Sequence, residues 1–143
     1  MTRTTEAPIL QSLVQTLRAN NSAFDAATID GSLHGIHEET APTGTKMPFL
    51  IYRLVYAVYD DDFSNRTIRA AVDIEAVSEN QVEASNLDSV VLTTVEDSLA
   101  AVIGQSILFC RRVAGLRLSE VTEEGKKIYR VGGTYSLWTD QDL

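Results

Sequence analysis

The chain has 143 residues, of which 44% are apolar and 22% charged, and its formal net charge is −8. This balance is typical of one globular domain over residues 1–143 and excludes a wholly disordered chain. No apolar run approaches the roughly 20 residues of a membrane helix, and no apolar signal core follows the N-terminus, so we expect neither a membrane span nor a cleaved signal. The acidic excess argues against wrapping nucleic acid, which needs clustered cations.

The first predicted element is a helix over residues 7–19, where apolar residues recur at helical spacing. Residues 22–47 then carry glycines and prolines, and we expect a long irregular segment anchored by Phe24 and Ile29. A connection of this length in a small domain usually carries function or becomes ordered on a partner.

A long antiparallel hairpin is predicted next, with strands over residues 49–59 and 67–77 and a turn between them. The first strand is apolar on both sides, so we expect cover on both faces, with one face made of Leu50, Tyr52, Leu54, Tyr56 and Val58. The second alternates more cleanly: Arg69, Asp73 and Glu75 point outward, and the inward set is Ile68, Ala70, Val72, Ile74 and Ala76.

A second helix is predicted from a cap at Ser78 to Ile103, with Gly104 ending it. Its apolar positions recur at steps of three and four residues, at Ala84, Leu87, Val91, Val95, Leu99 and Val102.

Two more strands are expected over residues 107–121 and 127–138. In the last strand, one face consists of Tyr129, Val131, Tyr135 and Leu137, and the other of Arg130, Thr134, Ser136 and Trp138. Gly132 and Gly133 indicate a bulge or a close backbone approach within it. The predicted fold is α+β: a two-layer domain in which two helices cover one face of a mainly antiparallel four-stranded sheet, in the order α-β-β-α-β-β.

Two segments hold clustered side chains of the kinds that bind metal ions. The segment 34–39 holds two histidines and two acids, but no second cluster supplies further ligands at a known spacing. The aspartates that begin segment 60–65 resemble a calcium loop, yet its glycine and its bidentate glutamate are missing. The residues concerned are His34, His37, Glu38, Glu39, Asp60, Asp61 and Asp62. We therefore predict no metal and no cofactor.

Nucleophilic chemistry also lacks a pattern, because no Gly-x-Ser-x-Gly elbow occurs and neither histidine has a partner nearby in the sequence. The single cysteine, Cys110, excludes an internal disulfide and is expected to be a buried, inert thiol. The chain is therefore predicted not to be an enzyme.

The charge is unevenly distributed along the chain. Residues 109–130 hold six basic and three acidic side chains, or +3, so the remainder carries −11. This basic hairpin could simply be solvated, or could meet an acidic partner or a neighbouring copy. Its basic residues are Arg111, Arg112, Arg117, Lys126, Lys127 and Arg130. Trp138 is either an interface anchor or a packing residue.

Several features together resemble the tail terminator (tail completion) proteins of long-tailed bacteriophages. They are the small acidic domain, the N-terminal helix, the loop that runs through residues 42–49 into a strand, the helix 78–103 and the closing strand 129–138. The resemblance implies a hexameric ring on the tail tube that stops tube polymerisation and offers a docking surface to the head-tail connector or stopper protein. It also implies a place in the virion, at the head–tail junction, after synthesis in the host cytoplasm.

Under this resemblance, the basic residues of 109–130 and Trp138 are candidates for subunit interfaces. The acidic and histidine-containing segments, Asp60–Asp62 and residues 34–39, are candidates for facing the lumen or the tube. DNA would pass through the lumen without specific binding, since acidic walls do not retain it. Changing Arg112 and Arg117 to Glu is expected to weaken the ring.

Three other functions remain open from the sequence. One is another tail or neck component, such as a head–tail stopper or a tube subunit. Another is a cellular ligand-binding module that uses Tyr52, Tyr56 and Tyr59 as its surface. The third is an enzyme that depends on His34 and His37.

Overall fold

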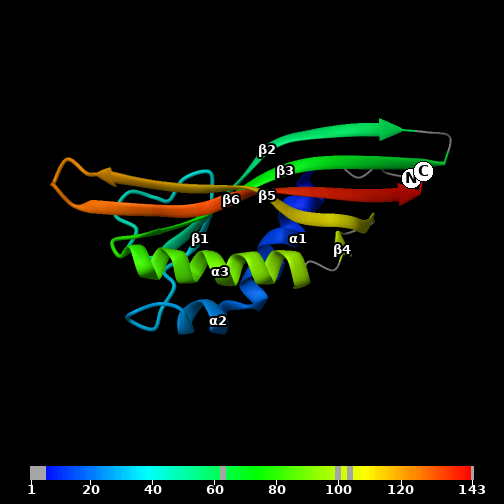
Figure 1. Ribbon diagram of the computed structural model, residues 1–143. Helices are drawn as coiled ribbons and strands as arrows, with labels where there is room; N and C mark the ends of the chain where they lie inside the picture. Colours follow the sequence, from blue (N-terminus) through cyan, green and yellow to red (C-terminus); the bar gives the residue numbers. More distant parts are fainter. Residues whose placement is uncertain (1–5, 62–63, 99–100, 103–104, 143) are drawn as a thin grey trace.

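The computed structural model describes residues 6–61, 64–98, 101–102 and 105–142. Over these residues, helices cover one face of a six-stranded sheet, which confirms the two-layer α+β class (Figure 1). The helices are α1 (Glu6–Ala19), α2 (Asn21–Ala26) and α3 (Gln81–Ser98). The strands are β1 (Ile36–Glu38), β2 (Phe49–Asp61), β3 (Asn65–Ser78), β4 (Ala101–Val102), β5 (Gln105–Val121) and β6 (Lys127–Asp142). The predicted count of four strands and two helices is therefore wrong, because short elements were missed.

The sheet order is β1-β2-β3-β6-β5-β4, so β3 and β6 lie at its centre. The pair β1–β2 is parallel and every other pair is antiparallel. Two long hairpins, β2–β3 and β5–β6, point in opposite directions in Figure 1. The two strands that were missed, β1 and β4, are three and two residues long, too short for a periodic signal.

The core lies between the helices and the inward face of the sheet. The alternation predicted for β3 and β6 is confirmed, because the inward apolar residues are buried except Tyr129, which is only partly buried. The helices complete the core through Ile9, Leu13, Leu17, Phe24, Leu87, Val91 and Val95. Those in α1 and α3 recur at four-residue steps, so that they lie on one side of each helix.

The second predicted helix begins and ends differently from the prediction. Asn80, not Ser78, is the N-cap, since its side-chain oxygen accepts a hydrogen bond from the Glu83 amide at 3.0 Å. The helix ends at Ser98, and Val102 lies in β4 rather than in the helix. Leu99, Ile103 and Gly104 lie outside the described residues.

A bulge between Leu54 and Tyr56 changes the face alternation of β2. Beyond it, Ala57 packs against the core while Tyr56 and Val58 are exposed, so the predicted single face through Leu50 to Val58 is wrong. Cover on both faces holds only for residues 49–52, which are buried. There the outer face carries a small second cluster of Phe49, Ile51 and Val77, against which Ala41, Met47 and Ile128 pack.

The segment 22–47 is less irregular than predicted, because it contains most of α2 and all of β1. Phe24 is a buried anchor as expected, but Ile29 is 73% exposed and anchors nothing. The Ile29 amide instead donates to the Glu83 carboxylate at 2.5 Å, so the backbone rather than the side chain fixes this turn to α3.

The Gly132–Gly133 pair marks a close backbone approach, one of the two predicted alternatives. A Cβ at Gly132 would overlap the Ile74 carbonyl oxygen of β3. A Cβ at Gly133 would meet the Ala114 carbonyl oxygen of β5 at 2.5 Å. The two glycines therefore let β6 pass closely between its two neighbours.

Candidate protein-interaction surface

Two long stretches of strand edge face no other strand of the described residues. On one side of the sheet, β1 pairs only with residues 50–52 of β2, which leaves 53–61 with one neighbour. On the other side, β4 pairs only with residues 105–106 of β5, which leaves 107–121 with one neighbour. Such edges present unpaired backbone donors and acceptors, and natural proteins normally shorten, cover or block them.

Large apolar side chains are exposed beside both edges. On β2 they are Val55, Tyr56, Val58 and Tyr59. On β5 they are Val113, Leu116, Leu118 and Val121, the last 69% exposed. Several exposed apolar residues along one strand edge mark an interaction site more often than scattered single ones do.

Arg112, one of the predicted interface residues, is held inside the subunit. Its guanidinium forms a two-pronged ion pair with Asp88 of α3 and donates to the Tyr135 hydroxyl at 2.7 Å. The hydrogen bonds that Arg112 donates to the Asp88 carboxylate raise the pKa of Arg112 above its ordinary value. Burial raises the pKa of Tyr135 to about 12, although Arg112 acts against this shift. The cluster joins α3 to β5 and β6 and therefore serves the fold.

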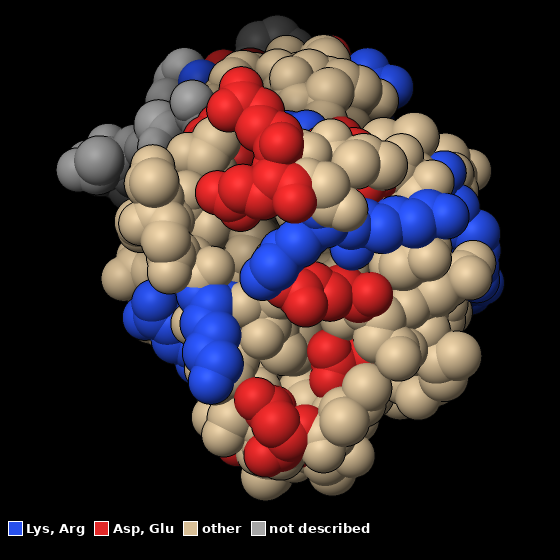
Figure 2. Space-filling view, turned by 90° about the vertical axis from the view of Figure 1, so that its left-hand side faces the viewer, with Lys and Arg blue, Asp and Glu red and all other residues tan. Residues whose placement is uncertain are grey.

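The other basic residues occupy several surfaces. Arg117 is exposed and reaches the Ser85 hydroxyl at 3.2 Å, while Lys126 pairs with Glu79 at 3.1 Å. Lys127 lies over the Tyr129 ring, 5.4 Å from its centroid. Figure 2 shows the end of the molecule that faced left in Figure 1, and there basic and acidic side chains are interleaved. The +3 segment is therefore not a uniform positive patch.

A charged ladder crosses the outer face of the sheet, centred on Glu75. This carboxylate is only 5% exposed although the residue points away from the helices as predicted. It lies 3.0 Å from Arg130 and 3.5 Å from Arg53, and Arg130 also reaches Glu120 at 3.1 Å. Arg130 is thus engaged with two strands of its own sheet.

Trp138 and the acidic end of β2 lie at the far end of this outer face. Trp138 is half-exposed, with the Arg69 guanidinium 5.4 Å from its ring centroid. Asp60 lies 3.9 Å from Arg69, and Asp61 pairs with Arg66 at 2.7 Å. Asp62 lies outside the described residues.

The segment 34–39 lies far from these aspartates. Glu38 is level with Tyr52, eight residues before Asp60 along β2, or about 26 Å at the usual rise of a strand. His34 pairs with Asp30 at 3.0 Å, and the His37 ring packs edge-on against Phe49. The two sets of residues predicted to face the lumen or the tube are therefore not one site.

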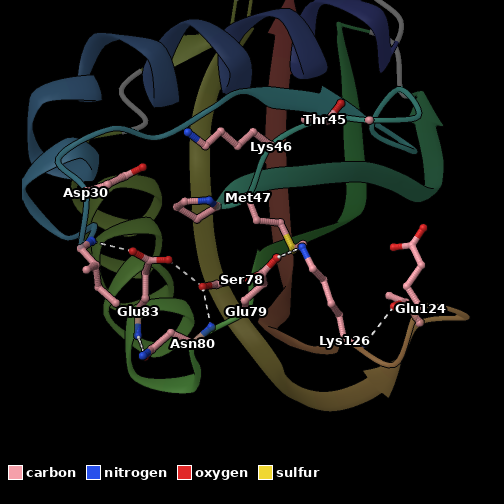
Figure 3. Close-up of a pocket in the computed structure, with 14 residues that line it drawn as sticks. Asp30, Thr45, Lys46, Met47, Ser78, Glu79, Asn80, Glu83, Glu124 and Lys126 are labelled. Atoms are coloured by element: carbon pink, nitrogen blue, oxygen red, sulfur yellow. Dashed lines mark hydrogen bonds and ion pairs between the residues drawn. The ribbon is translucent and has the colours of Figure 1, made fainter.

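A hollow of about 920 Å³ opens between the start of α3, the loop 44–48 and the β5–β6 hairpin (Figure 3). Its buried acid, Glu83, accepts hydrogen bonds from the Ser78 hydroxyl at 2.6 Å and from the Ile29 amide. The Asn80 amide donates to the Ser78 oxygen at 3.0 Å, so these groups satisfy one another. The hollow is a structural joint, with no buried polar group of this set left for a ligand.

Cys110 is the one cysteine of the chain, and it is partly buried. Burial, assisted by Glu96, raises the pKa of Cys110 to about 12, so its thiol stays protonated and weakly nucleophilic. Among the residues described, no three His, Cys, Asp or Glu side chains gather as a metal-ligand group. None of the described helices is long and apolar enough to cross a membrane.

Comparison with known proteins gives a match of fold. No protein-family model and no curated protein sequence matches this chain. Among solved structures, it is similar to a chain of the virion of a native gene transfer agent (GTA) particle, with a TM-score of 0.67. That match covers 95% of this chain and 99% of the other at 11% identity. A second structure matches with a TM-score of only 0.40 and 11% identity, over 89% of this chain and 94% of the other.

Sequence reasoning missed the two edges that dominate this surface. The apolar content of β2 and β5 was visible, but the alternation alone could not say which strands lie at the sheet margin. The row of apolar residues on both sides of residue 115 is visible in the sequence, but a fully covered strand and a free edge share this pattern.

Proposed function

We propose that this protein is a component of a phage-like virion and, more narrowly, a tail terminator. In this role it forms a ring on the tail tube, stops tube polymerisation and offers a docking surface to the head–tail connector. It does so by association alone, without catalysis and without a cofactor. The particle is assembled from protein made in the host cytoplasm.

The observation that carries this proposal is the fold match to a chain of a gene transfer agent virion, which extends over nearly the whole of both chains. The resemblance described from the sequence supports the narrower role. The two free strand edges add a physical reason, because head-to-tail contacts between different surfaces close into rings when the rotation fits. The acidic excess of the chain suits a lumen through which DNA passes without adhering.

A tube subunit is the main alternative, and the same free edges favour it, since they could also support open polymerisation. A ligand-binding module built on the three tyrosines is less well supported. Tyr52 is buried in the core, whereas Tyr56 and Tyr59 lie on opposite faces of β2. These side chains therefore do not form one surface.

Electron microscopy of the purified protein, alone and mixed with tail tubes, tests the proposal. A terminator is expected to form single rings of six copies and to cap tube ends at stoichiometric amounts. Long cylinders formed by the protein alone would indicate a tube subunit instead. A protein that stays monomeric in excess and leaves tubes uncapped would overturn the proposal.

A further inference from the structure

We propose that neighbouring copies of this chain join by antiparallel pairing of the free edge of β2 in one copy with the free edge of β5 in the next. This inference rests on the proposed function, because it describes how the subunits of the ring meet. The partner at each free edge is a second copy of the same chain.

Strand direction favours this pairing. Each of the pairs β2–β3, β3–β6 and β6–β5 is antiparallel, so β5 runs opposite to β2 within one sheet. A second copy in the same orientation therefore brings its β2 antiparallel to β5 of the first. Antiparallel ladders form readily between separate segments, and a rotation about an axis along the strands would repeat the contact from copy to copy.

One register uses the free stretch of β2 in full. Pairing must begin at Arg53, because β1 occupies the edge beside residues 50–52. With Arg53 opposite Leu118, seven steps along each strand bring Asp60 opposite Arg111. Each strand carries one bulge in this interval, between Leu54 and Tyr56 in β2 and between Arg112 and Ala114 in β5. The extra residue in β2 shifts the register by one position between the two bulges, and the extra residue in β5 restores it before Asp60.

Side-chain chemistry agrees with this register. It places Tyr56 beside Leu116 and Val58 beside Ala114, all on the outer face of the sheet. Tyr56 and Val58 are more than 40% exposed in the single copy, and such cross-strand apolar pairs stabilise a sheet. At the end of the ladder the exposed Asp60 carboxylate meets Arg111, so acidic and basic ends are matched.

The sheet itself excludes a contact within one chain between these edges. Three inter-strand spacings, about 14 Å, separate β2 from β5, and a disulfide needs Cα atoms within about 7 Å. A disulfide between cysteines at positions 56 and 116 can therefore form only between two copies.

The test is disulfide trapping in a Cys110→Ala background. The variant carries Tyr56→Cys and Leu116→Cys, two exposed positions whose replacement leaves the core intact. The matched control carries Tyr56→Cys and Gly115→Cys, which face opposite sides of the sheet; a Cβ at Gly115 meets nothing within 4 Å. Both are oxidised under identical conditions, resolved on non-reducing gels and viewed by electron microscopy.

The expected result is a ladder of cross-linked species in the 56/116 variant, at least tenfold more abundant than in the 56/115 control. A mixture of the two single-cysteine chains, one carrying a size tag, should give only the mixed dimer. Rings that form without this cross-link, or with equal cross-linking in the control, overturn the inference and leave the proposed function standing. A wild-type protein that never self-associates overturns both.

Discussion

The helix-covered face of the sheet and its two margins carry similar apolar side chains in different surroundings. Where the helices pack on the covered face, Ile74 of β3 and Leu87 of α3 are both removed from water. Along the margins, residues such as Tyr56 and Leu118 remain exposed in the single copy. The apolar side chains of the covered face are buried when the chain folds. Those at the margins can be buried only when another molecule binds there. Substitutions should therefore separate stability from association.

The largest effect is expected from truncating the covered face. Leu87→Ala removes a fully buried side chain of α3 and should lower the free energy of unfolding by about 2–5 kcal/mol. Urea unfolding followed by circular dichroism measures this loss. The matched variant Leu118→Ser, at the β5 margin, should change it by less than about 0.5 kcal/mol and instead reduce ring mass in light scattering. Equal losses of stability in the two variants would contradict the comparison.

The ion pair between Arg112 of β5 and Asp88 of α3 lies where the covered face meets the β5 margin. Arg112→Ala leaves the half-buried Asp88 unpaired and should cost about 3 kcal/mol of unfolding free energy. Lys126→Ala, which breaks the exposed pair with Glu79, should cost less than about 1 kcal/mol. Both are measured by urea unfolding at one salt concentration.

Because Arg112 serves the fold and Arg117 is exposed, changing each of them to Glu should affect the ring in different ways. Arg112→Glu would disturb the fold before it disturbed an interface, so Arg117→Glu is the sharper test of the basic edge. A stable Arg112→Ala protein would show that the Asp88 cluster contributes little.

Alkaline pH should weaken the covered side of the sheet. Burial raises the pKa of Cys110 from 9.0 to about 12 and that of Tyr135 from 10.0 to about 12. Both groups hold their protons more tightly in the folded chain, so their contribution is present below pH 9 and is lost as pH rises through 9–12.

Urea midpoints measured between pH 8 and pH 11 should therefore fall with pH. The fall that begins near pH 9 should be smaller in Cys110→Ala, because that variant lacks the thiol. In the folded protein at pH 8, Cys110 should react with a disulfide reagent much more slowly than in urea. Rapid reaction in the folded state would contradict the partial burial of this thiol.

The smallest effect is expected at the charged end of the β2 margin. Asp60→Asn should weaken association only a few-fold and reduce its sensitivity to salt, because an exposed charge pair contributes about 1 kcal/mol or less. Sedimentation at two salt concentrations measures this change. The exchange of Asp60→Arg with Arg111→Asp should restore association that each single substitution weakens.

The sequence by itself determined the inward faces of β3 and β6 and the apolar stripes of α1 and α3. Their side chains repeat with the period of the element, and burial of one face follows from that period. It also determined that no recognised catalytic motif is present. The candidate residues of the basic segment were visible as a charge cluster, but their partners were not.

Only the tertiary structure decided the order of the strands, and with it which edges remain free. The reversal at Val55 depends on a bulge against β3, which no local pattern in β2 encodes. The assignment of Arg112 to the fold depends on Asp88, 24 residues earlier in the chain. Strand neighbours and ion-pair partners are set by contacts between distant segments, and the periodicity of one segment carries no information about which other segment will lie beside it.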